Sequence, residues 1–249
     1  MANVSRRVVL AAPAAALATG AISAAGGKMT LAMHQNTSAP AGYRKSLEGW
    51  ARAGIKEVEL TNTLLDEFLK SDTLQGARKV LDDLGLTPVH AAVGVVNLWE
   101  PHPENRAALD GLKRRCEQFG ALGLKHVYAP CTTTQKVTAD DYPRGVANMR
   151  NAAEVVKQFN MLLRIEFTRT SSFIATLPTV LKMTREAAHP SLSPMLDCYH
   201  FYSGLSKLED LDLIKTGEIG HVHFQDVPDM PRELFDATTR LIPGDGVSP

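Results

Sequence analysis

Two histidines and an amide alternate with apolar residues in the stretch 220–226, near the end of the 249-residue chain. Because side chains alternate along a strand, we expect His221, His223 and Gln225 on one face, with Val222 and Phe224 on the other. Imidazoles and an amide on one face suit the polar mouth of a barrel or a metal site. The alternative is that one histidine is hydrogen-bonded inside the core and the other caps the strand end.

Two apolar runs upstream each end in an acid. Glu166 ends one run and Asp197 ends the next, and His223 lies on the strand after them. If these three strands are neighbours in a barrel, their ends can converge on one point. Two carboxylates and one imidazole suit a hard or borderline divalent ion such as Mn²⁺, Mg²⁺, Co²⁺ or Zn²⁺. The alternative is that the acids cap helices or form ion pairs at the rim.

The elements that must position these residues alternate regularly between strands and helices. The predicted strands are 29–34, 56–60, 88–93, 126–129, 162–167, 194–197 and 220–224. The predicted helices are 43–53, 74–84, 104–119, 142–159, 173–188 and 208–214. Units of this kind predict a parallel sheet with crossover helices, and continuous apolar strands are typical of such a sheet.

Two architectures fit this alternation, an open doubly wound sheet and a closed (β/α)8 barrel. The first strand lacks the Gly-rich loop that usually marks a nucleotide-binding open sheet. Polar residues instead follow the predicted strand ends, where barrels keep their sites. These residues are His34, Glu59, His90, Glu166, Asp197 and His223. We therefore favour the TIM barrel.

Only seven strands can be counted, so we expect a barrel that lacks its eighth strand and is open between the first and the seventh. A closed barrel typically takes about 250 residues, more than follow residue 27 here. Open sheet edges invite pairing with another chain, so association with a second copy, as a homo-oligomer, is an expected consequence.

The motifs together resemble a known family. Ile165-Glu166, Asp197-Cys198-Tyr199-His200, His221-Val222-His223 and Pro243-Gly244-Asp245-Gly246 resemble the xylose-isomerase-like TIM-barrel superfamily of sugar isomerases and epimerases, over most of residues 29–249. The resemblance implies that Glu166, Asp197 and His223 bind one divalent metal and that His200 contacts substrate or metal. It also implies a fourth ligand, a glutamate ending strand eight, which we expect to be missing here together with the second acid/base group.

The same resemblance implies chemistry on a ketose or related keto-sugar. A metal would polarise the carbonyl and an adjacent hydroxyl and stabilise an enediolate, while Glu166, as ligand and base, moves the proton at the neighbouring carbon. Trp99 is a candidate for stacking on the sugar ring, the alternative being a packed aromatic at the rim. Arg240 and Arg169 are candidates for binding an anionic or hydroxylated substrate.

Three functions remain open from the sequence. The first is a metal-dependent sugar isomerase or epimerase. The second is a lyase or hydrolase of the same superfamily acting on keto-glycosides or keto-inositols. The third is a truncated, catalytically weak barrel that binds a ligand. With 27 basic and 27 acidic residues, the chain has no electrostatic reason to bind nucleic acid or an anionic membrane.

Residues 1–27 differ from the rest of the chain. Arg6 and Arg7 precede an apolar, alanine-rich run over 8–18, which is typical of a twin-arginine export signal. Val9 stands where that motif prefers Phe, so a Sec-type signal is the nearest alternative. The run is short for a membrane span, which needs ~20 residues. We expect an exported, periplasmic protein whose barrel domain is 28–249.

Overall fold

The structure is a computed structural model that describes residues 29–96, 98–100 and 105–249. The predicted export signal, 1–27, lies outside the described residues. Ala32–Pro249 form one compact unit, and Met29–Leu31 belong to a separate N-terminal unit. The fold below is that of Ala32–Pro249. No helix in the described part of the chain is both long and apolar enough to cross a membrane.

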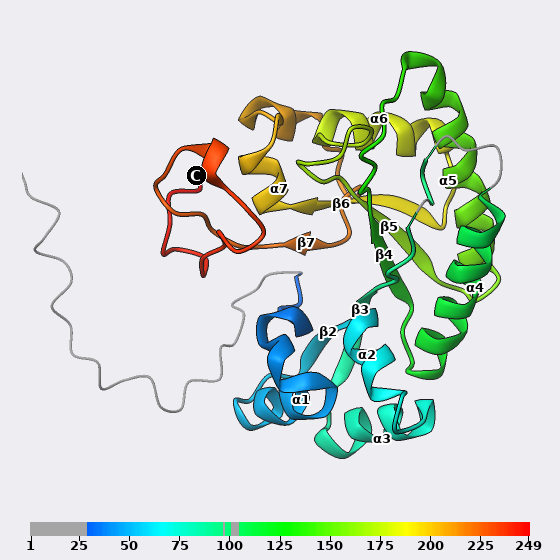
Figure 1. Cartoon of the computed structure of the whole chain (residues 1–249), viewed down its shortest axis with the longest axis vertical. Coiled ribbons are helices and arrows are strands. Elements are labelled where there is room, and N and C mark those ends of the chain that lie inside the picture. Colours follow the sequence, from blue (N-terminus) through cyan, green and yellow to red (C-terminus); the bar gives the residue numbers. More distant parts are fainter. Residues whose placement is uncertain (1–28, 97, 101–104) are drawn as a thin grey trace, which may run out of the picture. The chain divides into compact units, whose positions relative to one another are not determined.

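Seven parallel strands form one sheet in the order of the sequence (Figure 1). They are β1 (Met33–His34), β2 (Glu57–Thr61), β3 (Thr87–Ala92), β4 (His126–Pro130), β5 (Leu162–Glu166), β6 (Leu192–Asp197) and β7 (Val222–His223). Each strand pairs with the next, and within the described residues no ladder joins β1 to β7. The predicted fold class, a TIM-barrel type with seven strands, is confirmed.

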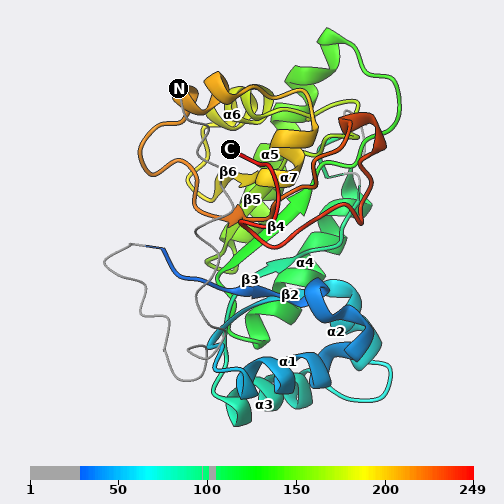
Figure 2. The same cartoon turned by 90° about the vertical axis from the view of Figure 1, so that its left-hand side faces the viewer.

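The helices follow the strands as crossovers and cover the outer face of the curled sheet (Figures 1 and 2). They are α1 (Gly42–Arg52), α2 (Asn62–Phe68), α3 (Leu74–Leu84), α4 (Arg106–Ala121), α5 (Tyr142–Lys157), α6 (Leu177–Ala187) and α7 (Cys198–Ser203). The sequence patterns did not predict α2 and α7, which begin directly after β2 and β6. The predicted helix over 208–214 is instead a 3₁₀ segment, Leu208–Leu213.

Several predicted elements differ in extent for identifiable reasons. The first and last strands are shorter than predicted, because each pairs with a single neighbour and residues beyond that pairing have no ladder to join. Helix α6 begins at Leu177 rather than at 173. Thr176 caps it by accepting the N–H of Thr179, and a side chain–backbone bond of this kind fixes a helix start.

The hydrophobic core lies between the outer face of the sheet and the helices. Strand β5 shows the division: Leu163 and Ile165 are fully buried in that core, whereas Arg164 and Glu166 alternate onto the inner face. Fully burying a side chain of this size stabilises the fold by about 1.5–3 kcal/mol. The outer layer thus holds the strands whose inner faces carry the polar residues.

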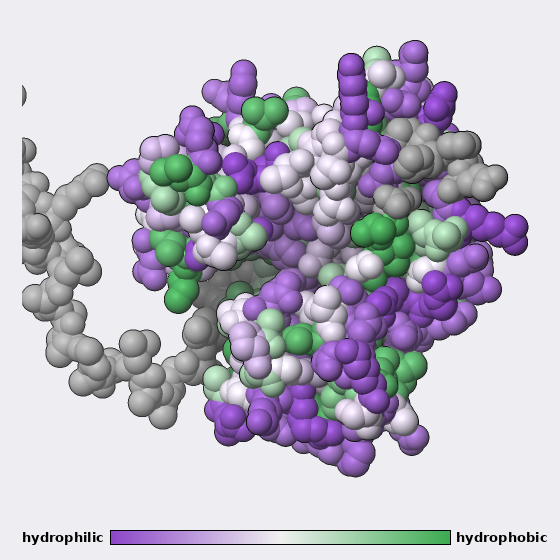
Figure 3. Space-filling view, viewed as in Figure 1, coloured by the Kyte–Doolittle hydropathy of each residue, from purple (hydrophilic) through white to green (hydrophobic). Residues whose placement is uncertain are grey.

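Exposed apolar side chains gather in the last quarter of the chain. Leu205, Leu234 and Ile242 are 80%, 60% and 74% exposed, and Figure 3 shows hydrophobic patches on the lobe that the C-terminal segment forms. An apolar surface of this kind is consistent with association, and the homo-oligomer stays a prediction.

Asp226 ties the C-terminal segment to the end of β7. Its carboxylate accepts the backbone N–H groups of Val227, Gly244, Gly246 and Ser248 at 2.8, 3.1, 3.0 and 2.8 Å. These donors, the Ser248 N–H first among them, hold the pKa of Asp226 well below its usual value. A Cβ at position 246 would collide with the Val227 carbonyl oxygen, so only glycine lets the turn approach this closely.

We predict that Asp226→Asn loosens this segment, because an amide offers one acceptor oxygen where the carboxylate offers two. Amide hydrogen exchange at Gly244, Gly246 and Ser248 should accelerate. In the wild type the carboxylate's contribution is fully present above the unfolded pKa of about 3.9 and is lost as the pH falls through the lower folded value. The exposed Asp229→Asn is the matched control. Equal protection in both variants would contradict the assignment.

Candidate active site

The inner face of the sheet is polar at the carboxyl ends of its strands. Parallel strands end at one edge of a barrel, which is where barrels place their sites. The residues brought together there are His34, Glu59, His90, Tyr128, Glu166, Asp197, His221 and His223. Barrel interiors are more often filled by branched aliphatic side chains, so this concentration of ionisable groups marks the candidate site.

The structure brings together the three residues that the sequence analysis assigned to a metal. Nδ1 of His223 lies 3.1 Å from Oε1 of Glu166 and 3.4 Å from Oδ2 of Asp197. The two carboxylates are 6% and 1% exposed. Asp197 also accepts the His200 backbone N–H at 2.8 Å and the Gln225 side-chain amide at 2.9 Å. The carboxylate is therefore held in place by its neighbours.

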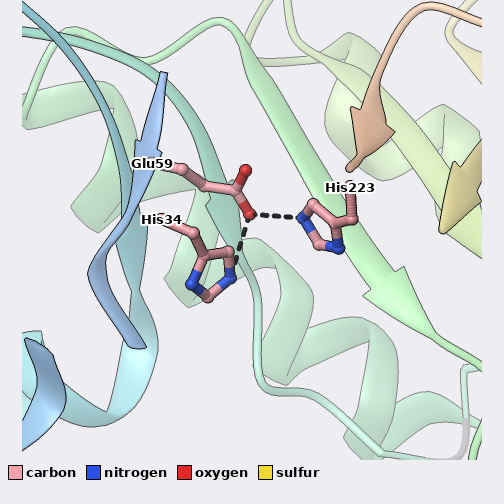
Figure 4. A group of neighbouring side chains, drawn as sticks. All are labelled: His34, Glu59 and His223. Atoms are coloured by element: carbon pink, nitrogen blue, oxygen red, sulfur yellow. Dashed lines mark hydrogen bonds and ion pairs between the residues drawn. The ribbon is translucent and has the colours of Figure 1, made fainter. Parts of the chain in front are cut away.

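Glu59, at the inner face of β2, contacts three imidazoles, of which Figure 4 shows those of His34 and His223. Its oxygens lie 2.7 Å from Nε2 of His221, 3.0 Å from Nε2 of His223 and 3.2 Å from Nε2 of His34. The sequence showed Glu59 and His34 as polar residues at strand ends but gave them no role. The contact between β2 and β7 shows how far the sheet curls.

The electrostatics of the cluster favour a cation. Burial opposes the charged imidazolium, but Glu59, Asp197 and Glu166 together raise the pKa of His223 well above its usual value. Burial also raises the pKa of Glu166 to about 7, against the effect of His223. Burial opposes ionisation of Asp197 as well, yet His223, His200 and Arg240 hold its pKa below the usual range. Three carboxylates thus surround the imidazole of His223, and this excess of acidic groups favours a cation.

The donor set at Glu166, Asp197 and His223 fits a divalent ion. Nδ1 of His223 lies 3.1 and 3.4 Å from the two carboxylate oxygens, a spacing that lets one ion bind Nδ1 and either oxygen at roughly 2.0 to 2.6 Å. His200 belongs to the same neighbourhood, because ligand atoms of Glu166, Asp197 and His200 all lie within 4.8 Å of one another.

Two neighbouring groups have similar spacing but fit an ion less well. In the group of His34, Glu59 and His223, Nδ1 of His34 accepts the Asn36 N–H at 3.0 Å. The neutral ring then carries its proton on Nε2 and donates to Glu59. In the group of Glu59, His90 and His221, the two rings stack at 3.9 Å with 1° between their planes, so no ion can lie in the plane of both.

His200 and Arg240, two further residues named in the sequence analysis, lie close to Asp197. Burial lowers the pKa of His200, on α7, to about 4. Nη1 of Arg240 lies 3.4 Å from Oδ2 of Asp197, and the guanidinium lies 4.0 Å from the centre of the Tyr199 ring. Both residues therefore lie at the site.

Trp99 and Arg169, the other candidates for contacting substrate, are held by packing and by hydrogen bonds to the backbone, and their substrate-binding roles stay predictions. Trp99 is 1% exposed and presents no open face to a sugar ring, so the alternative of a packed aromatic side chain describes its position. Arg169 donates to the backbone carbonyls of Ser203 and Phe235 at 3.2 and 2.7 Å, and also to that of Arg232. It holds the C-terminal segment.

Tyr128 is a site residue that sequence reasoning missed. Its hydroxyl lies 3.1 Å from Nε2 of His34, and its ring meets the His223 ring edge-on at 5.1 Å between centres. The available signal was alternation in β4, which places His126 and Tyr128 on the inner face.

Comparison with known proteins agrees with this geometry. Residues 47–249 match the family model described as xylose isomerase-like TIM barrel. The chain belongs to this family. The inosose isomerase of Halalkalibacterium halodurans is 23% identical over 208 residues, which cover 81% of this chain and 73% of that protein. The inosose isomerase of Bacillus subtilis is 22% identical over 148 residues, which cover 58% of this chain and 52% of that protein.

Solved structures share the fold. The IolI protein with a bound zinc atom superposes with a TM-score of 0.80 at 20% identity, covering 88% of this chain and 81% of that one. A D-psicose 3-epimerase crystallised with D-fructose gives a TM-score of 0.65 at 19% identity, covering 82% and 76%. Within this xylose isomerase-like barrel, the polar cluster lies at the carboxyl ends of the strands, the end that carries the active site in barrel enzymes.

We predict that His223→Ala abolishes stoichiometric binding of a divalent ion, because it removes the imidazole whose Nδ1 lies 3.1 Å from Glu166 and 3.4 Å from Asp197. Binding of Zn²⁺ and Mn²⁺ can be measured by titration and by elemental analysis after dialysis. His189→Ala is the control, since His189 pairs with Glu154 at 2.9 Å on the outside of the barrel. Equal metal content in both variants would refute the site.

Proposed function

We propose that this protein is a divalent-metal-dependent isomerase or epimerase that acts on a ketose or related keto-sugar through an enediolate. The observation that carries the proposal is the convergence of buried Glu166, Asp197 and His223 at one end of the barrel. Family membership supports it, as do relatives named inosose isomerase and a similar fold that acts as a D-psicose 3-epimerase. A similar structure with bound zinc supports the metal.

Glu166, Asp197 and His223 would hold the metal, which when bound supplies polarisation of the substrate carbonyl and its neighbouring hydroxyl. Glu166 is also the proposed base that removes the proton from the carbon next to the carbonyl. Burial raises the pKa of this carboxyl to about 7 when no metal is bound. A bound cation would lower that pKa and keep Glu166 ionised, so that it can accept the proton.

His200 suits a hydrogen-bond donor to the substrate. Its Nδ1 accepts the Arg169 backbone N–H at 3.4 Å, which places the proton of the neutral ring on Nε2. Because burial lowers its pKa to about 4, His200 is neutral at physiological pH. It would donate to a carbonyl or hydroxyl oxygen and orient the substrate over Glu166.

Arg240 suits recognition of substrate oxygens at the rim. Its guanidinium is held against the Tyr199 ring and beside Asp197, and its side chain is 33% exposed. A guanidinium in this position can donate to hydroxyl or carboxylate oxygens. It would hold the end of the sugar farther from the reacting carbon.

We predict that the enzyme, supplied with Mn²⁺, Co²⁺ or Zn²⁺, catalyses incorporation of solvent deuterium beside the carbonyl of a ketose or inosose. In H₂O the product should keep the mass of the substrate. Glu166→Gln should lower the rate about 10²- to 10⁴-fold, the usual contribution of a general base. The readouts are NMR of the exchanging carbon and mass spectrometry of the product.

The control variant is Glu67→Gln, whose carboxylate is 69% exposed and pairs with Lys70. It should retain full activity, and a chelator should remove the activity of both this variant and the wild type until metal is restored. A product lighter by one water would instead identify a lyase. No turnover with any of these metals would favour a ligand-binding barrel.

A further inference from the structure

One carboxylate in the barrel interior is surrounded by ring nitrogens. Glu59 is 2% exposed, and its two oxygens lie 2.7, 3.0 and 3.2 Å from ring nitrogens of His221, His223 and His34. An ionised carboxylate can only accept hydrogen bonds. The Nε2 atoms of His34, His221 and His223 that meet its oxygens must therefore each carry a hydrogen.

His223 is engaged on both of its nitrogens. Nε2 lies 3.0 Å from Oε1 of Glu59, while Nδ1 lies 3.1 Å from Glu166 and 3.4 Å from Asp197. The ring thus separates one carboxylate on the β2 side from two on the β5 and β6 side. In the neutral His223 ring, one nitrogen carries a hydrogen and the other has a free lone pair. Only the nitrogen without the hydrogen can bind a cation.

We propose that Glu59 is a positioning residue: by accepting the Nε2 hydrogen it holds His223 in the tautomer whose Nδ1 lone pair faces Glu166 and Asp197. The proposal rests on the metal site of the proposed function and adds which atom binds. A carboxylate behind a ligating imidazole fixes the ring and strengthens it as a ligand, and losing such a partner typically costs 10- to 100-fold in metal affinity.

The other contacts of Glu59 are compatible with its accepting the Nε2 hydrogen of His223. Nδ1 of His34 accepts the Asn36 N–H, so its Nε2 donates to Glu59. His221 donates to the other oxygen at 2.7 Å. The rings of Tyr128, His34 and His221 meet the ring of His223 edge-on, with centres 5.1 to 5.2 Å apart. These contacts restrict rotation of the imidazole.

The hydrogen bonds of Glu59 also have a mechanical effect, because they link β2 to the region of β7. Strand β7 is two residues long and pairs only with β6, so its free side has no ladder within the described residues. Glu59 on β2 reaches across the barrel to His223 of β7 and to His221, which directly precedes that strand. A purely mechanical role and a tautomer-setting role therefore have to be separated by experiment.

The test compares wild type, Glu59→Gln and the control Glu67→Gln in binding of Zn²⁺ and ¹¹³Cd²⁺ alone, with histidine ¹⁵N NMR. In the wild type, cadmium should couple to Nδ1 of His223, and Nε2 should carry a slowly exchanging hydrogen. Glu59→Gln should bind 10- to 100-fold more weakly and lose that hydrogen or reverse the tautomer. Glu67→Gln makes the same change at an exposed carboxylate that pairs with Lys70, and it should keep both the affinity and the tautomer.

Coupling of cadmium to Nε2 would overturn the proposal. So would a Glu59→Gln protein that is less heat-stable yet binds the metal as tightly as wild type, because that result shows only a mechanical role. If Glu59→Gln does not fold, Glu59→Asp carries the test: its shorter carboxylate should withdraw from Nε2 and weaken binding, and unchanged affinity would refute the idea.

A wild type that binds no divalent ion would refute the proposed function but not by itself the role of Glu59. The metal-free spectrum then decides, since the hydrogen between Nε2 and Glu59 should be present without metal. Its absence from the metal-free wild type would overturn the positioning role independently.

Discussion

A negative charge buried inside the barrel is the constraint on which the rest of the site depends. Glu59 is almost fully enclosed, and burying an ionised carboxylate is costly unless hydrogen bonds compensate it. The compensation comes from β1 and β7, through His34, His221 and His223. The interior is polar for this reason, and His90 is packed flat against His221 where a barrel would more often place an aliphatic side chain.

The same charges explain why one carboxylate is suited to proton transfer. Glu59 and Asp197 stay ionised because each has several donors. Glu166 shares the Nδ1 of His223 with Asp197, and burial raises its pKa to about 7. Acidic groups thus outnumber the basic ones that can neutralise them, which favours a cation beside Glu166 and Asp197. Arg240, beside Asp197, is the remaining cation at the rim.

How much of the fold and of the candidate site could be predicted depends on how local each sequence signal is. Alternation in Leu162–Glu166 and the acid at its end are local, so the sequence predicted the strand, the inward face and the neighbourhood of Glu166. The contact between Glu59 and His223 spans 164 positions and depends on the curl of the sheet, which no local pattern encodes. Trp99 follows a predicted strand and was a candidate for the rim, but whether an aromatic side chain on a loop points inward depends on tertiary packing, which a local pattern does not encode. The short β1 and β7 likewise depend on which partners an edge strand finds.

The stretch 220–226 contributes to the candidate site in two ways, through its histidines and through Asp226. His221 and His223 face the carboxylates, while three residues later Asp226 binds the amides of the 244–248 turn and pairs with Leu241 in an antiparallel bridge. Leu241 directly follows Arg240, so the bridge fixes where that guanidinium meets Asp197. Arg169 holds the same segment through the carbonyl of Phe235. The recognition proposed at the rim and the ligation proposed inside the barrel would therefore both depend on one short stretch of chain, and a change at Asp226 should displace Arg240 without moving His223.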